Sequence, residues 1–153
     1  MEFVRYKQAH FSARFPADYL YAPSHYWMAP TADAPGTCRV GFTKFATRML
    51  GELVEAQFEV KPGEAVSAGQ AIGYVEGFKA ASDVFSSLGG TFAGGNPTLA
   101  VDACIVRSSP YTDGWLYAVE GTPPADALDV HQYIDLLDAT INRMAAEQEH
   151  QEA

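Results

Sequence analysis

Positive charge is scarce in this chain of 153 residues. Lys and Arg together number 10 against 19 Asp and Glu, which gives a net charge of -9 at pH 7. Nucleic acids and anionic membrane surfaces both attract clusters of Lys and Arg, so the composition argues against either as a partner. We expect proteins or small molecules as partners instead.

Cysteines and long apolar runs are also scarce. Cys38 and Cys104 lie far apart and form no Cys-x-x-Cys or Cys/His cluster, so no local pattern supports a metal site. We expect two reduced, partly buried thiols, and a redox role for Cys104 stays open. No stretch is long enough to span a bilayer, and the N-terminus lacks the pattern of a secretory signal. These features predict a soluble, cytoplasmic protein.

A catalytic cluster is missing as well. The four histidines are scattered, and no Ser/His/Asp or paired-carboxylate pattern is visible. The glycine pairs lack the Lys-Ser/Thr that follows in a phosphate-binding loop. The sequence therefore predicts that this protein is not an enzyme.

Hydrophobic residues make up 48% of the chain, enough for one core but not for two separate domains. Short apolar segments broken by Gly and Pro predict a mostly β domain, and apolar residues three and four apart after position 130 predict a C-terminal helix. We divide the chain into an N-terminal extension packed on the domain (1–18), the β domain (19–121), the C-terminal helix (122–146) and a flexible tail (147–153).

Two local patterns stand out within the β domain. Phe42, Phe45 and Met49 fall at helical spacing, with Thr43 placed to cap a short helix and Gly51 to end it. Further along, a lysine lies in a turn between two expected strands. That turn would hold the backbone of Lys79 still and expose its amine, as an enzyme that modifies lysine requires.

Several ordered blocks of the chain resemble the lipoyl-carrying H protein family of glycine cleavage. The segment 76–83, Glu-Gly-Phe-Lys-Ala-Ala-Ser-Asp, is similar to the family's Glu-Ser-Val-Lys-Ala-x-Ser-Asp. The other blocks are 21–27, 41–53, 61–69, 96–97 and 108–115. The resemblance implies a barrel-sandwich hybrid of two small antiparallel sheets, of the lipoyl/biotinyl-carrier type, with a short internal helix and a C-terminal helix.

The resemblance also implies a cofactor and its attachment site. Lipoate would be joined covalently to Lys79, and the lipoyl arm would travel between partner enzymes. Glu76 and Gly63 match positions that lipoate-attaching enzymes recognise. Biotin carriers, the nearest rival, place Met on both sides of the lysine, whereas here the neighbours are Phe78 and Ala80, which disfavours biotin.

Some residues depart from the family around the expected cleft for the arm. The Glu that follows Ser-His in the family, and that holds a cationic aminomethyl cargo, is Tyr26 here. Phe78 makes the turn more apolar than the family's Val, and Lys44 and Phe45 also oppose a bound cation. In addition to Tyr26 and Phe78, we assign Ser24 and Asp83 to the cleft, because they match the family's remaining polar contacts.

These departures favour a branch of H-like proteins that serves oxidative sulfur metabolism. In that interpretation, the lipoyl arm shuttles sulfur-bound intermediates and works with a heterodisulfide-reductase-like complex. The alternatives are an H protein of glycine cleavage, with glycine decarboxylase and aminomethyltransferase as partners, and a cofactor-free binding module of the same fold. The carrier interpretations also imply dihydrolipoamide dehydrogenase and either a lipoate-protein ligase or a lipoyl transferase.

Overall fold

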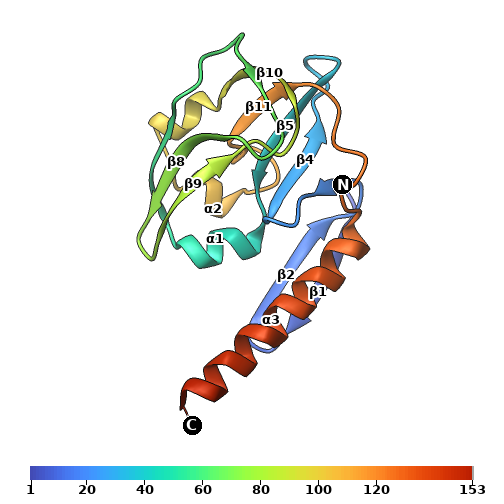
Figure 1. The fold of residues 1–153 in the computed structure, drawn as a ribbon, viewed down its shortest axis with the longest axis vertical. Helices are drawn as coiled ribbons and strands as arrows, with labels where there is room; N and C mark the ends of the chain where they lie inside the picture. The colour runs from blue at the N-terminus through green and yellow to red at the C-terminus, as the bar shows by residue number, and fades with distance from the viewer. Residues whose placement is uncertain (153) are drawn as a thin grey trace.

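The structure is a computed structural model that describes residues 1–152, with side chains through 149. It contains two antiparallel sheets, a separate β hairpin and a long C-terminal helix (Figure 1). The elements are β1 (Phe3–Gln8), β2 (Phe11–Pro16), β3 (Leu20–Tyr21), β4 (Tyr26–Pro30), β5 (Thr37–Phe42), α1 (Lys44–Leu50), β6 (Leu53–Phe58), β7 (Ala65–Val66), β8 (Ala71–Gly77), β9 (Ala81–Phe85), β10 (Gly90–Gly95), η1 (Pro97–Ala100), α2 (Ile105–Ser108), β11 (Tyr117–Glu120) and α3 (Val130–Glu152).

The two sheets form the β domain. One has the strand order β3-β4-β5-β11-β10-β7 and the other the order β6-β8-β9. Both contribute buried side chains to one hydrophobic cluster, which we call the sheet core. It is mostly aliphatic and includes Val40, Leu53, Ile72, Val75, Val84, Leu88, Leu116 and Val119. The predicted mostly β fold, with a short internal helix and a C-terminal helix, is confirmed.

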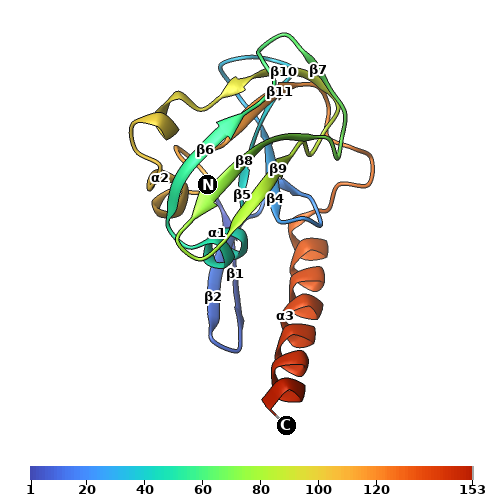
Figure 2. The same cartoon turned by 60° about the vertical axis from the view of Figure 1, so that its left-hand side comes forward.

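The first 16 residues contain a β hairpin that the sequence did not predict. Strands β1 and β2 pair from Phe3 opposite Pro16 to Gln8 opposite Phe11. The hairpin contacts α3, where the Tyr6 hydroxyl donates to Asp138 Oδ1 over 3.0 Å. Both elements extend beyond the β domain in the same direction (Figures 1 and 2).

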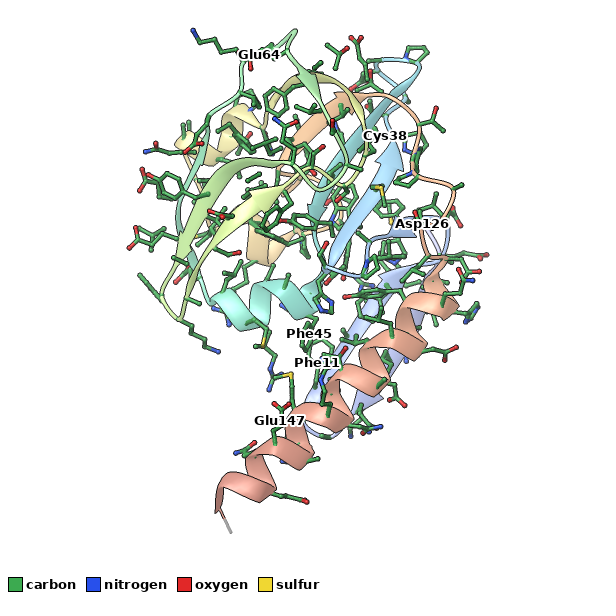
Figure 3. All side chains as sticks on the ribbon, in the orientation of Figure 1. Phe11, Cys38, Phe45, Glu64, Asp126 and Glu147 are labelled. Atoms are coloured by element: carbon green, nitrogen blue, oxygen red, sulfur yellow. The ribbon has the colours of Figure 1, made fainter. Side chains whose placement is uncertain are left out.

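A second hydrophobic cluster joins this hairpin and α3 to the β domain, and we call it the aromatic core. Phe15 lies at its centre, with its ring 5.4 Å from that of Tyr133 on α3. Phe11 on the hairpin meets Phe45 on α1 edge to face at 5.6 Å (Figure 3). The aromatic core consists of Tyr6, Phe11, Phe15, Tyr21, Trp27, Ala29, Phe45, Tyr111, Val130, Tyr133 and Leu137.

The helix α1 begins and ends at the residues that the sequence predicted. The Thr43 side chain accepts a hydrogen bond from the Ala46 amide at the start of α1, and Gly51 ends the helix with φ 74°, as predicted. α3 begins at Val130 and continues to Glu152, past position 146, where we expected the helix to end. The domain boundaries and the flexibility of 147–153 stay predictions, and position 153 lies outside the described residues.

The two cysteines differ in exposure. Cys38 is buried, but Cys104 is exposed rather than partly buried, because it lies at the surface just before α2. Within residues 1–152, no helix is both long enough and apolar enough to cross a membrane.

Candidate functional site

Lys79 lies in the tight turn between β8 and β9. The Gly77 amide donates to the Ala80 carbonyl over 2.9 Å and closes the turn, and the residues at its tip are exposed. In Figure 1 this turn lies at an end of the β domain, beside α1. The structure therefore exposes Lys79 as the sequence predicted.

The turn is held against the C-terminal end of α1. The Lys79 amide donates to the Leu50 carbonyl over 2.9 Å, and the Phe78 amide donates to the Glu52 carbonyl over 3.0 Å. The last carbonyls of a helix have no partner within the helix, so the turn satisfies one of them. Position 51 favours glycine, because its φ is 74° and a Cβ there would lie 3.1 Å from the Lys79 amide nitrogen.

The Lys79 side chain is less constrained than its backbone. Its ammonium donates to the Arg48 carbonyl over 3.4 Å, a long and exposed hydrogen bond. Because that contact is weak, the amine is free to meet a modifying enzyme while the turn stays fixed. A fixed backbone with a released side chain is the geometry that a covalent carrier site requires.

A cavity of about 310 Å³ adjoins the turn. Ala80, Ala81 and Ser82 line it from the side of the turn and β9, and Phe45, Ala46, Met49 and Leu50 line it from α1. The remaining lining residues are Ser24, His25, Tyr26, Phe42 and Phe85. None of the twelve is an acidic residue, a lysine or an arginine, so the cavity is largely apolar.

His25 is a polar group in this cavity whose position we did not predict. Its Nδ1 lies 2.8 Å from the Tyr133 hydroxyl, which is itself 2.8 Å from Thr43 Oγ1. Burial lowers the pKa of His25 from 6.5 to about 4, so the imidazole is neutral at pH 7. No local pattern reveals this contact, because Tyr133 lies in α3, 108 residues further along the chain.

The four residues that we assigned to the arm cleft are not equally close to this cavity. Ser24 and Tyr26 line it. Phe78 lies beside Lys79 with 76% of its surface exposed. Asp83 lies exposed on β9 and is absent from the lining.

Tyr26 is buried, and its hydroxyl is bonded within the β domain. Its hydroxyl accepts a hydrogen bond from the Phe85 amide over 3.1 Å. Burial, with a smaller contribution from the charge of Asp83, raises the pKa of Tyr26, so the hydroxyl stays protonated. Tyr26 therefore supplies an uncharged wall where a carboxylate would supply charge.

The two residues that we assigned to ligase recognition lie apart. Glu76 is exposed on β8, opposite Ala81 on β9 and three residues before Lys79. Gly63 has φ 95° in the turn before β7. Its neighbour Glu64 lies at the opposite end of the β domain from the β8–β9 turn (Figure 3). The structure brings Glu76, but not Gly63, close to the lysine.

Cys104 also lies near the turn. Its thiol donates to Glu52 Oε1 over 3.1 Å, and Glu52 is the residue whose carbonyl accepts from Phe78. That hydrogen bond to the carboxylate, more than any other cause, raises the pKa of the Cys104 thiol. The thiol is therefore protonated at neutral pH and is a poor nucleophile.

The fold and this site define a class of protein. A lysine is displayed on a rigid turn, and no group of His, Cys, Asp and Glu within the described residues could hold a metal ion. The exposed lysine on that turn fits a carrier domain. The family model of the glycine cleavage H-protein matches residues 19–141, and the chain belongs to this family.

Similar proteins agree with this assignment. A glycine cleavage system H protein of Opitutus terrae is 40% identical over 112 residues, which cover 73% of this chain and 86% of that protein. One from Corynebacterium aurimucosum is 34% identical and covers 79% and 94%. The crystal structure of a glycine cleavage system H protein from Mycobacterium marinum matches with a TM-score of 0.69 at 36% identity, covering 78% and 95%. H proteins are not enzymes, and they carry lipoate covalently on a lysine.

Proposed function

We propose that this protein carries lipoate on Lys79 and serves the glycine cleavage system. The observation that carries the proposal is the β8–β9 turn, whose backbone is bonded to the end of α1 while the lysine amine stays exposed. Lys61 also lies at an exposed turn, but it does not line the apolar cavity that adjoins Lys79. Lys79 is therefore the lysine best suited to the arm.

The residues around Lys79 fit a lipoyl arm. The arm's sulfurs accept and release the cargo, and its hydrocarbon part is apolar, as is most of the lining of the adjoining cavity. Phe78, next to Lys79, and Met49, which lines the cavity, are exposed apolar side chains. They provide a surface on which an apolar arm can rest when it is not engaged by a partner enzyme.

Neutral His25 and the hydroxyls of Ser24 and Ser82 are the hydrogen-bonding groups of the cavity lining that could orient a polar cargo. The partners that this function requires are glycine decarboxylase, aminomethyltransferase, dihydrolipoamide dehydrogenase and a lipoate-protein ligase or transferase. A cytoplasmic location is part of the same proposal.

The preference for oxidative sulfur metabolism finds no support in the relatives described above, which are named glycine cleavage system H proteins. One observation keeps a sulfur carrier as the second candidate. No carboxylate lines the cavity beside Lys79, so a cationic cargo would meet no opposite charge there.

Attachment is tested by producing the protein together with a lipoate-protein ligase and measuring its intact mass. We expect one lipoyl group on the wild-type protein and none on Lys79→Arg. Lys61→Arg is the matched control, because Lys61 is an exposed lysine in another turn, and it should be modified like the wild type. An unmodified wild type, or a modified Lys79→Arg, would refute the carrier site.

The cargo is tested by adding the lipoylated protein to glycine decarboxylase and aminomethyltransferase. Glycine-dependent release of CO₂ that requires Lys79 supports the glycine cleavage function. If the lipoylated protein supports no glycine turnover, but its reduced arm accepts sulfur from a persulfide donor, the second candidate replaces the first.

A further inference from the structure

A second cavity, of about 330 Å³, lies where the N-terminal hairpin meets α1 and the segment that follows α2. Phe3 and the stretch 12–14 line it from the hairpin, Lys44 lines it from α1, and the stretch 107–112 completes the wall. It shares no lining residue with the cavity beside Lys79. The hairpin wall also lies outside residues 19–141, so the family match does not account for this cavity.

The charge of this cavity is opposite to that of the protein. Arg14, Lys44 and Arg107 line it, and no acidic residue does. The whole chain has only 10 Lys and Arg against 19 Asp and Glu, so three cations in one cavity are a marked concentration. Glu2 and Asp113 adjoin lining residues in the sequence but are absent from the lining, and Asp113 lines a neighbouring hollow together with Asp33 and Arg39.

None of the three cations forms a salt bridge within the described residues. The salt bridge found there joins Arg39 to Asp33 and involves none of them. Arg14 places its guanidinium carbon 4.2 Å above the ring of Phe3, which leaves the hydrogen-bonding edge of the guanidinium free. Clustered cations without carboxylates repel one another, and a bound anion would relieve that repulsion.

A backbone contact fixes two of the cavity walls relative to each other. The Lys44 amide donates to the Tyr111 hydroxyl over 2.9 Å, which joins α1 to the segment after α2. Tyr111 is buried in the aromatic core. The hydroxyls of Ser12, Ser108 and Thr112 add donors beside the cations.

We infer that this cavity binds a small, multiply charged oxyanion, a metabolite that bears phosphate or carboxylate groups. Arg matches the oxygens of either group with paired N–H donors, and Lys adds a compact charge. The volume suits a small molecule. A bound anion would join β2 to α1 and to the segment after α2, and so stabilise the attachment of the N-terminal hairpin.

Calorimetric titration of the unlipoylated full chain tests the inference, with pyrophosphate and citrate as probes at constant ionic strength. We expect saturable binding of at least one probe, weakened about tenfold in Lys44→Gln and in Arg107→Gln, as expected when one charge-assisted contact is lost. Preference for pyrophosphate identifies the phosphate class, and preference for citrate identifies the carboxylate class. The assay needs no lipoate, so its result is independent of the function proposed for Lys79.

Lys61→Gln is the matched control, because it removes one exposed cation from another turn and should bind like the wild type. Thermal unfolding without ligand checks that each variant is folded. The inference is overturned if neither probe binds saturably, or if Lys61→Gln weakens binding as much as Lys44→Gln.

Discussion

The sheet core and the aromatic core differ in chemistry and in what they hold together. The sheet core is mostly aliphatic and joins the two sheets that present Lys79. The aromatic core fastens the β1–β2 hairpin and α3 to one side of the β domain. The family match covers the whole sheet core, but it leaves out Tyr6, Phe11 and Phe15 of the aromatic core.

The aromatic core, unlike the mostly aliphatic sheet core, contains many buried side chains with polar atoms. The Tyr21 hydroxyl donates to the Pro16 carbonyl over 2.7 Å, and Trp27 Nε1 donates to the Pro110 carbonyl over 2.8 Å. Aliphatic contacts have little directional preference, whereas a buried hydroxyl or N–H needs a partner in a defined place. The aromatic core therefore sets the position of the added elements as well as stabilising them.

The largest expected effect separates the two cores. Phe15→Ala should lower the free energy of unfolding by about 3–5 kcal/mol, because it empties the centre of the aromatic core. Ile72→Ala in β8 should cost about 2–5 kcal/mol. Under conditions where each variant is folded, the Phe15 variant should be lipoylated at the wild-type rate. The Ile72 variant should be lipoylated more slowly, because β8 carries the turn that holds Lys79. Denaturant unfolding measures the two stability losses, and ligase assays measure the two lipoylation rates. If both variants were lipoylated equally slowly, the two cores would not differ in their effect on the turn.

The next effect concerns His25, which joins α3 to the cavity beside Lys79. Its pKa is about 4 when folded and near 6.5 when unfolded, so between these values the unfolded chain holds more protons. The free energy of unfolding should therefore fall as the pH falls from about 6.5 to 4. In His25→Asn, unfolding in this pH range should take up fewer protons, by up to about one, so the free energy of unfolding should decline less steeply. Asn is the replacement because it tolerates the φ of 74° at this position. Parallel pH curves for the two proteins would exclude this role for His25.

A smaller effect on stability and lipoylation should come from Gly77, at the end of β8. A Cβ at this position would lie 2.2 Å from the Leu50 carbonyl oxygen, the atom that accepts from the Lys79 amide. Gly77→Ala should cost roughly 1–3 kcal/mol, as overpacking does, and should slow lipoylation. Gly69→Ala is the control, because its φ of 86° strains alanine while no atom lies near its Cβ, so it lowers stability without touching α1. Unchanged lipoylation of Gly77→Ala would show that the contact with α1 does not position the lysine.

The smallest effect should come from Tyr6, where the hairpin meets α3. Tyr6→Phe removes the hydrogen bond to Asp138 and should cost about 0.5–1.5 kcal/mol. Asp138→Asn keeps an acceptor oxygen and should cost less. Denaturant midpoints of the two variants measure the difference, and a larger loss in Asp138→Asn would contradict a simple hydroxyl-to-carboxylate contact.

The features that sequence patterns predicted correctly depend on neighbouring residues. Thr43 and Gly51 mark the ends of α1 because capping involves residues within one helical turn. The exposed turn at Lys79 follows from two short strands with a few residues between them. The role of Lys79 itself depended on the family resemblance, because an exposed lysine is common.

The features that were missed depend on contacts between distant segments. The β1–β2 hairpin alternates apolar and polar residues only over two short stretches, 4–7 and 11–15. The elements that bury its apolar face, α1 and α3, lie far along the chain. Asp83 matched a family position, yet it lies outside the cavity lining. The role of Gly63 in ligase recognition stays a prediction, and its neighbour Glu64 lies at the opposite end of the β domain from the β8–β9 turn (Figure 3).

The sequence by itself determined the β class of the domain, the short helix and the display of Lys79, because period, capping and turn residues act locally. Only the tertiary structure decided that His25 meets Tyr133 of α3, and that Arg14, Lys44 and Arg107 line one cavity. Each of these groupings joins elements far apart in the chain. The packing of the aromatic core, which no local pattern encodes, brings those elements together.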